Sequence, residues 1–471
     1  MTNYVFEGQY SWREDNTPFY TLGTLDRLTI SNNAFLNSLG SNSPIARIQG
    51  PAAIHLMPFA TVWAEDVAFH STSGGVTFDL YGDSIIYTGG TGILIEADPG
   101  SEAGNTINVA SMASIHSRNS SAVLSSGHTT VNNQGTIHAS SVNASALLFT
   151  GGHNDISNSG MGMIQGGILI YGGDNRIFNE FQVTADQGPA INLVSFVAGE
   201  SNIIINKGVI YSGPGRAGPY DVAIVANGPA NVTLENVGIG NESGYIFGDV
   251  YFGAGNDVIR NARASLIEGY IDLGAGDDHI ENRGGLVGDI NLGDGADSMT
   301  NYLSITNMVY GGAGNDSIAN YAFMDESVFL GAGDDEFFNY GYASVRVKTN
   351  GGDGSDKLHG GSKDDRLSGG DGNDYLHGGA GRDTFIFDAP ISGKNIDKID
   401  DFNGQEDGIQ LARSVFSQLN LGTLDQDAFR DGAAPADASD RIGYNATIMQ
   451  RERFGTIPTE RAPPRPSRSC G

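Results

Sequence analysis

The sequence predicts an all-β fold: a right-handed parallel β-helix that continues into a tighter β-roll. Three observations predict it. A turn of the form Gly-x-Gly-x-Asp recurs along the second half of the chain, an apolar residue follows each of its Asp residues two positions on, and Asn ends many of the expected strands. Self-similarity at 20–30 residues is typical of a solenoid, in which each coil stacks on its neighbours to bury its apolar face.

The turn motif sets the length of one coil. Successive Asp residues are separated by 21, 19, 19, 19 and 21 residues and then three times by 9, at Asp257, Asp278, Asp297, Asp316, Asp335, Asp356, Asp365, Asp374 and Asp383. Two nonapeptides make 18 residues, so we expect one Gly-Asp turn per coil before residue 356 and two per coil after it. Asp365 and Asp383 should then lie on the edge opposite the other seven. Because glycine tolerates positive φ, the motif indicates tight turns, on which Asp374 and Asp383 are expected to be exposed carboxylates.

The residues after each turn predict buried strands. The apolar residues two positions beyond the nine Asp residues are Ile259, Ile280, Met299, Ile318, Phe337, Leu358, Leu367, Leu376 and Phe385. Asn follows at Asn261, Asn282, Asn301, Asn320 and Asn339, and upstream at Asn108, Asn132, Asn158, Asn179, Asn206 and Asn236. Stacked Asn side chains can hydrogen-bond in ladders. Any single one of them is explained equally well by the preference of Asn for turns.

The expected organisation divides the chain into five segments. Residues 1–75 lack the turn motif and are rich in aromatic residues, so they are expected to cap the open end of the solenoid. Residues 76–345 are expected to form the β-helix, with a start nearer residue 20 as the alternative and with Gly-Asp turns from about residue 250, and residues 346–390 the β-roll. Residues 391–447 are expected to form a C-terminal cap. Residues 448–471, with five Arg, four Pro and the single cysteine, are expected to be a disordered basic tail.

Composition narrows the class of partner. The 471 residues include 55 Asp and Glu against 26 Lys and Arg, a formal net charge of −29, which argues against nucleic acid or an anionic membrane and favours a cation. The N-terminus has neither the basic nor the apolar region of a signal peptide. The apolar run at residues 52–66 is too short to cross a bilayer and is interrupted by Pro58. We therefore expect neither Sec-type export nor a membrane span.

The tandem nonapeptides resemble the calcium-binding repeats of the RTX (repeats-in-toxin) family. The best matches are GGAGND (311–316), GGDGSD (351–356), GGDGND (369–374) and GGAGRD (378–383). The resemblance implies a β-roll in which Ca²⁺, a cation that takes about six to eight oxygen ligands, lies between successive turns. Its ligands would be the Asp carboxylates and the backbone carbonyls of the glycine-rich turns.

As metal-binding residues the resemblance implies the nine Asp residues named above together with Gly312, Gly314, Gly352, Gly354, Gly370, Gly372, Gly379 and Gly381. Two kinds of turn depart from the family pattern. GGSKDD (360–365) has Lys363 in place of the second turn glycine. The copies that occur once per coil begin with Phe252, Leu273, Leu292 or Leu330 instead of the first Gly, and weaker binding is expected there.

The resemblance continues beyond the repeats. Residues 383–411 resemble the segment that closes the β-roll in secreted RTX proteins, and residues 422–432 and 440–447 resemble pieces of the C-terminal region that directs type I secretion. This implies an extracellular location and the type I secretion machinery as a partner. The resemblance covers about residues 250–447, whereas the first half resembles only β-helices in general.

The sequence leaves two main functions open. One is a non-catalytic surface, matrix or adhesive role, with extracellular polysaccharide or the cell surface as partner. The other is a polysaccharide-active lyase, hydrolase or epimerase, which needs clustered acid, base and charge-stabilising groups.

Such groups are few: the histidines of the first half are scattered, at His55, His70, His116, His128, His138 and His153. The best cluster, Tyr220 and Asp221 near Arg216 and Lys207, is explained better as a loop at a coil corner. A piece of a larger toxin is a third reading, but the chain has no apolar pore-forming segment. The sequence therefore favours a non-catalytic role.

Overall fold

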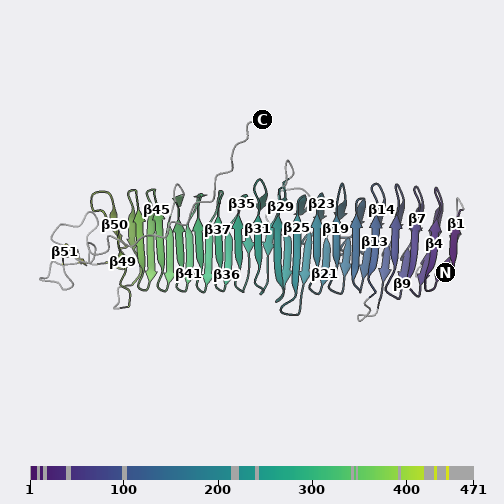
Figure 1. Ribbon diagram of the computed structural model, residues 1–471, viewed down its shortest axis with the longest axis horizontal. Coiled ribbons are helices and arrows are strands. Elements are labelled where there is room, and N and C mark those ends of the chain that lie inside the picture. The colour runs from purple at the N-terminus through teal and green to yellow at the C-terminus, as the bar shows by residue number, and fades with distance from the viewer. Residues whose placement is uncertain are drawn as a thin grey trace, which may run out of the picture.

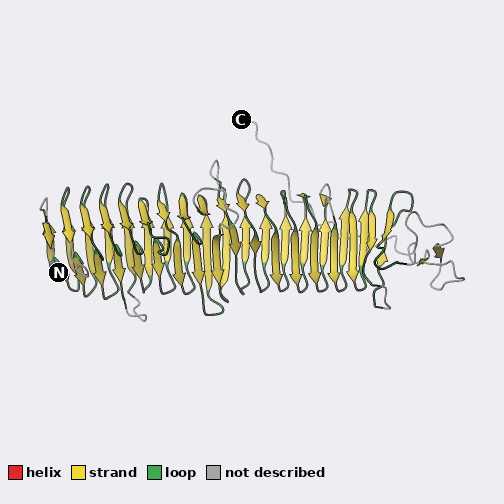
Figure 2. Ribbon diagram, turned by 180° about the vertical axis from the view of Figure 1, so that it is seen from behind, coloured by secondary structure: helices red, strands yellow, loops and turns green. Residues whose placement is uncertain are grey.

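The computed structural model describes residues 2–7, 11–13, 18–38, 44–97, 103–213, 222–238, 243–340, 344–345, 348–390, 394–417, 429–431 and 442–444. These residues form a long rod of stacked coils, whose strands lie across the long axis and follow one another in chain order from β1 (Asn3–Phe6) towards β50 (Gly408–Leu411) (Figure 1). All regular structure in the described part is β-strand (Figure 2). Accordingly, no helix in it is long and apolar enough to span a bilayer.

Each coil pairs in parallel with the next, so that three sheets run along the rod. The first sheet has eighteen strands: β1, β4 (Asp26–Ile30), β7 (Ala52–Leu56), β10 (Thr77–Leu80), β13 (Asn105–Val109), β16 (Thr129–Asn133), β19 (Asp155–Asn158), β22 (Arg176–Asn179), β25 (Ser201–Asn206), β28 (Asn231–Asn236), β31 (Val258–Asn261), β34 (His279–Asn282), β37 (Ser298–Asn301), β39 (Ser317–Asn320), β42 (Glu336–Asn339), β45 (Lys357–Gly361), β47 (Tyr375–Gly379) and β49 (Lys398–Ile399).

The second sheet has twelve strands: β2 (Ser11–Arg13), β5 (Phe35–Ser38), β8 (Thr61–Ala64), β11 (Ile85–Thr88), β14 (Ser114–Ser117), β17 (Thr136–Ala139), β20 (Met163–Gln165), β23 (Gln182–Ala185), β26 (Val209–Ser212), β29 (Tyr245–Phe247), β32 (Leu266–Glu268) and β35 (Gly285–Val287). Two short pairs complete the described strands: β40 (Phe323–Met324) pairs with β43 (Ser344–Val345), and β51 (Phe429–Asp431) pairs with β52 (Ile442–Tyr444).

The third sheet comprises β3 (Tyr20–Leu22), β6 (Ala46–Ile48), β9 (Phe69–Ser71), β12 (Ile93–Ile95), β15 (Val123–Ser125), β18 (Leu147–Phe149), β21 (Ile168–Tyr171), β24 (Ile191–Val194), β27 (Val222–Asn227), β30 (Asp249–Tyr251), β33 (Ile271–Asp272), β36 (Ile290–Asp294), β38 (Val309–Ala313), β41 (Val328–Ala332), β44 (Thr349–Asp353), β46 (Arg366–Asp371), β48 (Thr384–Phe387) and β50. The predicted all-β parallel solenoid is confirmed.

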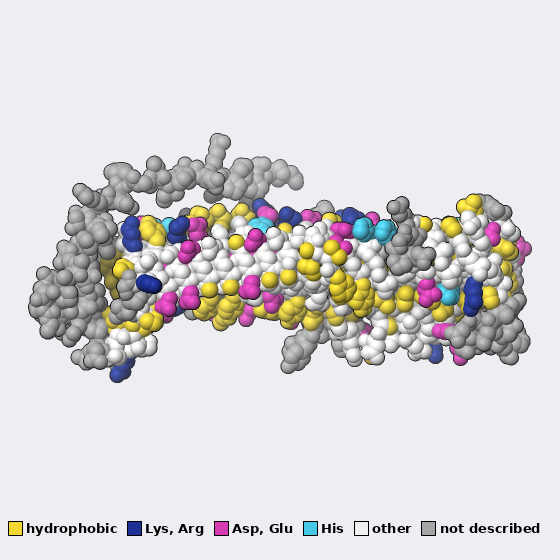
Figure 3. Space-filling view, turned by 90° about the horizontal axis from the view of Figure 1, so that it is seen from below, with side chains coloured by type: hydrophobic (Ala, Val, Ile, Leu, Met, Phe, Trp, Pro, Cys, Tyr) yellow, Lys and Arg dark blue, Asp and Glu magenta, His cyan; other side chains and the backbone are white. Residues whose placement is uncertain are grey.

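The core is a continuous column of aliphatic and aromatic side chains inside the three sheets. Side chains alternate between the interior and the surface along each strand, and the strands stack in register, so that Ile280 lies between Ile259 and Met299. The nine apolar residues predicted to follow the turns are all buried, at 1% exposure or less. On the outside, hydrophobic side chains also gather in a band along much of one long face (Figure 3).

The cross-section narrows towards the C-terminus. Through β35 each coil contributes one strand to each sheet, whereas from β44 the described coils alternate only between the third sheet and the first. Between these regions the second sheet is reduced to single bridges at Leu286, Ile305 and Met324 and to the β40–β43 pair. A second glycine-rich turn takes the place of the lost strand. The prediction of one Gly-Asp turn per coil, and then two, is confirmed.

A buried Asn ladder follows the ends of the first-sheet strands. Each Nδ2 donates to the Oδ1 of the next coil over 2.7–3.0 Å, from Asn133 through to Asn339. The predicted ladder is confirmed except at its start. Asn132 donates to Asn108 instead (2.8 Å), and the buried position belongs to Asn133, which is one residue later and therefore points to the opposite face of the strand.

The three-sheet coils reach the N-terminal end of the described chain. Strands β1, β4, β7 and β10 pair successively in the first sheet. Residues 1–75, for which the sequence predicts a cap, therefore carry strands of the same three sheets as the coils that follow, and the domain boundaries stay predictions. The predicted basic tail, residues 448–471, lies outside the described residues.

Candidate calcium-binding turns

Seven of the nine Gly-Asp turns lead from a third-sheet strand into a first-sheet strand, and the turns that end at Asp365 and Asp383 lead from a first-sheet strand into a third-sheet strand. The local sequence explains their shape. The eight glycines predicted as metal ligands all have φ between 95° and 146°. Successive turns stack so closely that a Cβ on Gly352 would overlap the carbonyl oxygen of Gly331, one coil earlier. Only glycine fits such positions, because positive φ and close backbone approach both exclude a side chain. The motif is therefore required by the backbone.

Seven Asp side chains form a file along one corner of the rod, which we call the first aspartate file. Its members are Asp257, Asp278, Asp297, Asp316, Asp335, Asp356 and Asp374. Each Oδ1 accepts a hydrogen bond of 2.6–2.9 Å from a backbone N–H one coil earlier, and in six of the seven cases that N–H belongs to the preceding Asp. Asp365 and Asp383 form a second file, because both precede strands of the third sheet instead of the first. The N–H of Asp365 donates to the Oδ1 of Asp383 (2.9 Å). The predicted separation into two edges is confirmed.

The expectation that Asp374 and Asp383 are exposed is wrong. Both are 2% exposed, and all nine Asp residues lie between 0% and 3%. The cause is the hydrogen bond to the preceding coil, which turns the carboxylate inward beneath its own turn rather than out into solvent. These carboxylates are therefore part of the interior of the rod.

The second oxygen of every carboxylate in the two files is buried without a hydrogen-bond partner. In the turns that begin with Gly-Gly, this Oδ2 lies in a small cradle under the first glycine. A Cβ on Gly360 would be 2.8 Å from the Oδ2 of Asp365 and 2.6 Å from the carbonyl oxygen of Gly378 in the next coil. Gly351, Gly369 and Gly378 have the same relation to their own Asp residues. The cradle thus brings together carboxylate and carbonyl oxygens without a hydrogen donor.

Burial raises the pKa of these carboxyl groups. The pKa of Asp278 and that of Asp365 rise to about 8 and that of Asp356 to about 7, chiefly because burial disfavours the charged form. The carboxylates one coil away raise the pKa of Asp356 further. A row of buried acceptors that repel one another needs either protons or a cation, and oxygen ligands are those that Ca²⁺ prefers. The residues present fit Ca²⁺.

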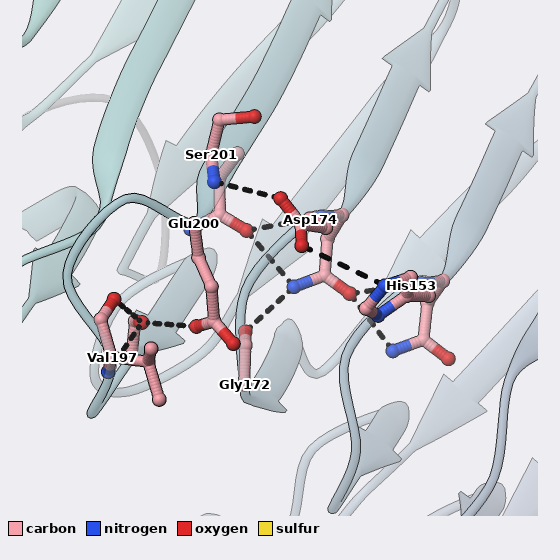
Figure 4. A network of polar contacts seen from close by, with 10 residues as sticks. His153, Gly172, Asp174, Val197, Glu200 and Ser201 are labelled. Carbon is pink, nitrogen blue, oxygen red and sulfur yellow. Dashed lines mark hydrogen bonds and ion pairs between the residues drawn. The ribbon is translucent and has the colours of Figure 1, made fainter.

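The same corner in the N-terminal half is built from Asn, and the comparison is informative. Asn154, Asn175 and Asn202 lie in line with the first aspartate file. Val232 is the register partner of Asn202, and its N–H donates to the Oδ1 of Asp257. The Oδ1 of Asn175 accepts from the N–H of Asn154 (3.0 Å), as in the Asp coils, but its Nδ2 donates to the carbonyl of Gly172 (2.7 Å). Figure 4 shows this network around Gly172 and Asp174. An amide satisfies this corner internally, and a carboxylate does not.

The turns that depart from the family pattern share the acidic feature. Asp257, Asp278, Asp297 and Asp335 follow Phe252, Leu273, Leu292 and Leu330, whose side chains are buried, and their Oδ2 atoms are unpartnered as well. At the turn that contains Lys363, the Oδ2 of Asp365 is equally unpartnered, and its Oδ1 faces the Nδ2 of Asn339 (3.5 Å).

Sequence reasoning missed two further carboxylates at the C-terminal ends of the files. The Oδ1 of Asp397 accepts from the N–H of Asp374 (3.3 Å), and that of Asp407 from the N–H of Asp383 (3.0 Å). Both precede an isoleucine by two positions, Ile399 and Ile409, which is the spacing of the repeats. The signal was present, but without the glycine-rich turn it did not stand out.

Among the described residues, the catalytic candidates make separate pairwise contacts. His116 and His138 are brought together, with 3.5 Å between their Nδ1 atoms, and the rings of His128 and His153 stack at 4.9 Å. Lys207 pairs with Glu180 (3.5 Å). Arg216, Tyr220 and Asp221 lie outside the described residues.

Comparison with known protein families identifies the type of repeat. Residues 306–319 and 350–385 match the model of the RTX calcium-binding nonapeptide repeat, in four copies. The chain therefore carries RTX calcium-binding repeats on a parallel β-solenoid. No curated protein and no solved structure matches the chain.

Proposed function

We propose that the protein is a secreted calcium-binding β-solenoid with a non-catalytic surface, matrix or adhesive role. The observation that carries the calcium part is the row of nine buried Oδ2 atoms without hydrogen-bond partners. A bound Ca²⁺ neutralises neighbouring carboxylates and coordinates the Oδ2 atoms that have no hydrogen-bond partner in the fold. Binding energy at such a site becomes folding energy, because the site does not exist in the unfolded chain.

The proposed ligand groups extend beyond the residues that match the repeat family. They are the nine Asp carboxylates, together with carbonyl groups of the turns that contain Gly312, Gly314, Gly352, Gly354, Gly370, Gly372, Gly379 and Gly381. The turns at Asp257, Asp278 and Asp297 precede the first matched segment. Their unpartnered Oδ2 atoms support calcium binding there too, with lower affinity because Phe or Leu replaces the first glycine.

A calcium titration of the full chain tests this proposal. Isothermal titration calorimetry of metal-free protein should give several Ca²⁺ ions per chain, and Asp335→Asn should remove one of them. Asp334→Asn is the matched control: Asp334 is the adjacent exposed residue, and its Oδ1 accepts from the N–H of Ser355 (2.8 Å), which an amide oxygen can also do. Equal calcium binding by the two variants would contradict the assignment of Asp335.

Secretion and the extracellular role rest on the resemblance of residues 383–447 and on the repeats. We propose export by a type I route, in which the C-terminal region is recognised and calcium-dependent folding follows outside the cell. Co-expression with a type I exporter should place the chain in the medium, and deletion of residues 391–447 should retain it in the cell. Export of the deleted chain at the same level would refute the route.

For the non-catalytic role, a panel of extracellular polysaccharides separates the two candidates. We expect retention on some immobilised polysaccharides or cell surfaces in calcium, with no change in polymer length and no new reducing or unsaturated ends. Release of such ends would establish the polysaccharide-active alternative instead.

A further inference from the structure

Beyond the aspartate files, one group of metal-ligating side chains stands at the C-terminal end of the roll. Strand β47 pairs with β49 so that Leu376 is opposite Ile399. The next residues, His377 and Asp400, therefore also stand opposite each other on the outer face, with Asp401 following. Among the described residues this is the only group of three His, Cys, Asp or Glu side chains whose ligand atoms all lie within 4.8 Å of one another. We propose that it binds a divalent transition-metal ion, with Zn²⁺ as the representative.

The distances between the ligand atoms fit such an ion. The Nδ1 of His377 lies 2.8 Å from Oδ1 of Asp400 and 3.4 Å from Oδ2 of Asp401. With zinc–ligand bonds of about 2.1 Å, atoms bound at angles between 90° and 109° are separated by about 3.0–3.4 Å. The ion can therefore replace the proton between imidazole and carboxylates with only small movements of the side chains.

The two carboxylates are held in place by groups behind them. The Tyr375 hydroxyl donates to Oδ2 of Asp400. The N–H of Gly378 donates to Oδ1 of Asp401 (3.0 Å), and the N–H of Gly379 donates to its Oδ2. Outer groups of this kind orient metal ligands and raise affinity. The side chains of His377, Asp400 and Asp401 are 34%, 25% and 21% exposed, which leaves access for an ion and its water.

The donor set separates this site from the calcium turns. Ca²⁺ takes oxygen ligands, whereas an imidazole nitrogen with two carboxylates suits Zn²⁺ and similar ions. Other histidines of the described chain form ion pairs with a single carboxylate, such as His70 with Glu96 at 2.7 Å. His377 is paired with two. Because its ligands come from β47 and from the residues after β49, a bound ion would fasten the last first-sheet strand to the roll.

The experiment uses the full chain in millimolar Ca²⁺, so that the calcium turns are saturated and the proposed function is not what is being tested. Zn²⁺ titration should show one ion per chain in the wild type, and Co²⁺ should give visible absorption bands that Zn²⁺ abolishes. His377→Gln should remove this stoichiometric binding, while His70→Gln should leave it unchanged. Tyr375→Phe should weaken it by about tenfold.

Folding of the variants is checked by their calcium stoichiometry. If His377→Gln alters it, Asp400→Asn serves as the second variant, since its amide oxygen still accepts from the Tyr375 hydroxyl and its NH2 group can donate to the Nδ1 of His377. Zn²⁺ binding of equal affinity in wild type and in whichever of these variants keeps the calcium stoichiometry would overturn the proposal. So would the absence of stoichiometric Zn²⁺ binding, which would leave the group a simple ion pair, or displacement of Zn²⁺ by excess Ca²⁺.

Discussion

Replacing Asp356 by Asn should stabilise the fold when calcium is absent and destabilise it when calcium is bound. In the wild type the Oδ1 of Asp356 accepts from the N–H of Asp335 (2.9 Å), and its Oδ2 is buried without a partner. Asparagine retains the oxygen that accepts this hydrogen bond. It replaces the unpartnered oxygen by a donor and removes the charge, as in the upstream coils.

The magnitude follows from the file. Asp356 has carboxylates on both sides, at Asp335 and Asp374, and a unit charge one strand spacing away, about 4.8 Å, costs about 2–3 kcal/mol at an effective dielectric of about 20–40. Partial protonation reduces this, because the pKa of Asp356 is raised to about 7 by burial and by those neighbours. We therefore expect Asp356→Asn to stabilise the calcium-free roll by about 1–3 kcal/mol, which is the cost of one unsatisfied buried polar group.

In calcium the sign should be opposite. A site that is saturated at about one hundred times its Kd contributes about 2.7 kcal/mol to the folded state, and the variant loses this contribution. Urea unfolding followed by hydrogen exchange of residues 348–390, with chelator and with Ca²⁺, measures both values. Asp353→Asn is the control, because Asp353 belongs to the same turn but is exposed. Destabilisation by Asp356→Asn in both conditions, or equal behaviour of the two variants, would refute the reasoning.

Three further outcomes follow from the same turns. In chelator, the stability of the coils that carry the first aspartate file should fall as pH rises from about 4 to 8. Burial raises the pKa of Asp257 to about 7 and that of Asp278 to about 8. Each group therefore stabilises the fold while it is protonated, and this contribution is lost when the group ionises. Urea midpoints at pH 5 and pH 8 check this, and a midpoint that rises with pH would contradict it. Gly369→Ala should abolish calcium binding at one turn, because the Cβ would overlap Oδ2 of Asp374, whereas Gly408→Ala, which meets nothing within 4 Å, should not; calorimetry measures both. Removal of calcium from the full chain should abolish hydrogen-exchange protection in residues 348–390 but not in residues 103–213, and equal protection with and without calcium would count against calcium-dependent folding.

The repeats made the fold predictable because spacing alone fixes which residues share a corner. A period of 18–21 residues places one Asp above the next, and the apolar residue two positions on must then point inward. Exposure was not predictable in this way. Gly-Asp turns are usually read as surface features, and the hydrogen bond from the N–H of Asp356 to the Oδ1 of Asp374 (2.9 Å), which draws the carboxylate inside, depends on a contact across a whole coil.

The site beside the roll illustrates the other limit. His377 and Asp400 are 23 residues apart, and the sequence between Phe387 and Lys398 does not contain the glycine-rich turn motif. They meet because β47 pairs with β49, and the length of the chain before β49, which departs from the nine-residue repeat, sets this register in a way that periodicity cannot reveal. Likewise Asn132 and Asn133 are the same residue type. Only the direction in which each side chain leaves the strand decides that Asn133, and not Asn132, joins the buried ladder.

The order of the two halves has a consequence for folding. In a solenoid each coil contacts only its neighbours, so a folded coil is a template for the next. The Asn coils satisfy their own corner groups, and the last of them meets the Asp coils where the N–H of Val232 donates to Asp257 (2.6 Å). The acidic coils therefore stack on a surface that is complete without calcium, while their own carboxylates repel one another until a cation enters. Calcium-driven folding should thus start at the Asn–Asp junction and proceed towards the C-terminus, so that a chain whose junction is broken by Val232→Pro folds its roll more slowly at the same calcium concentration.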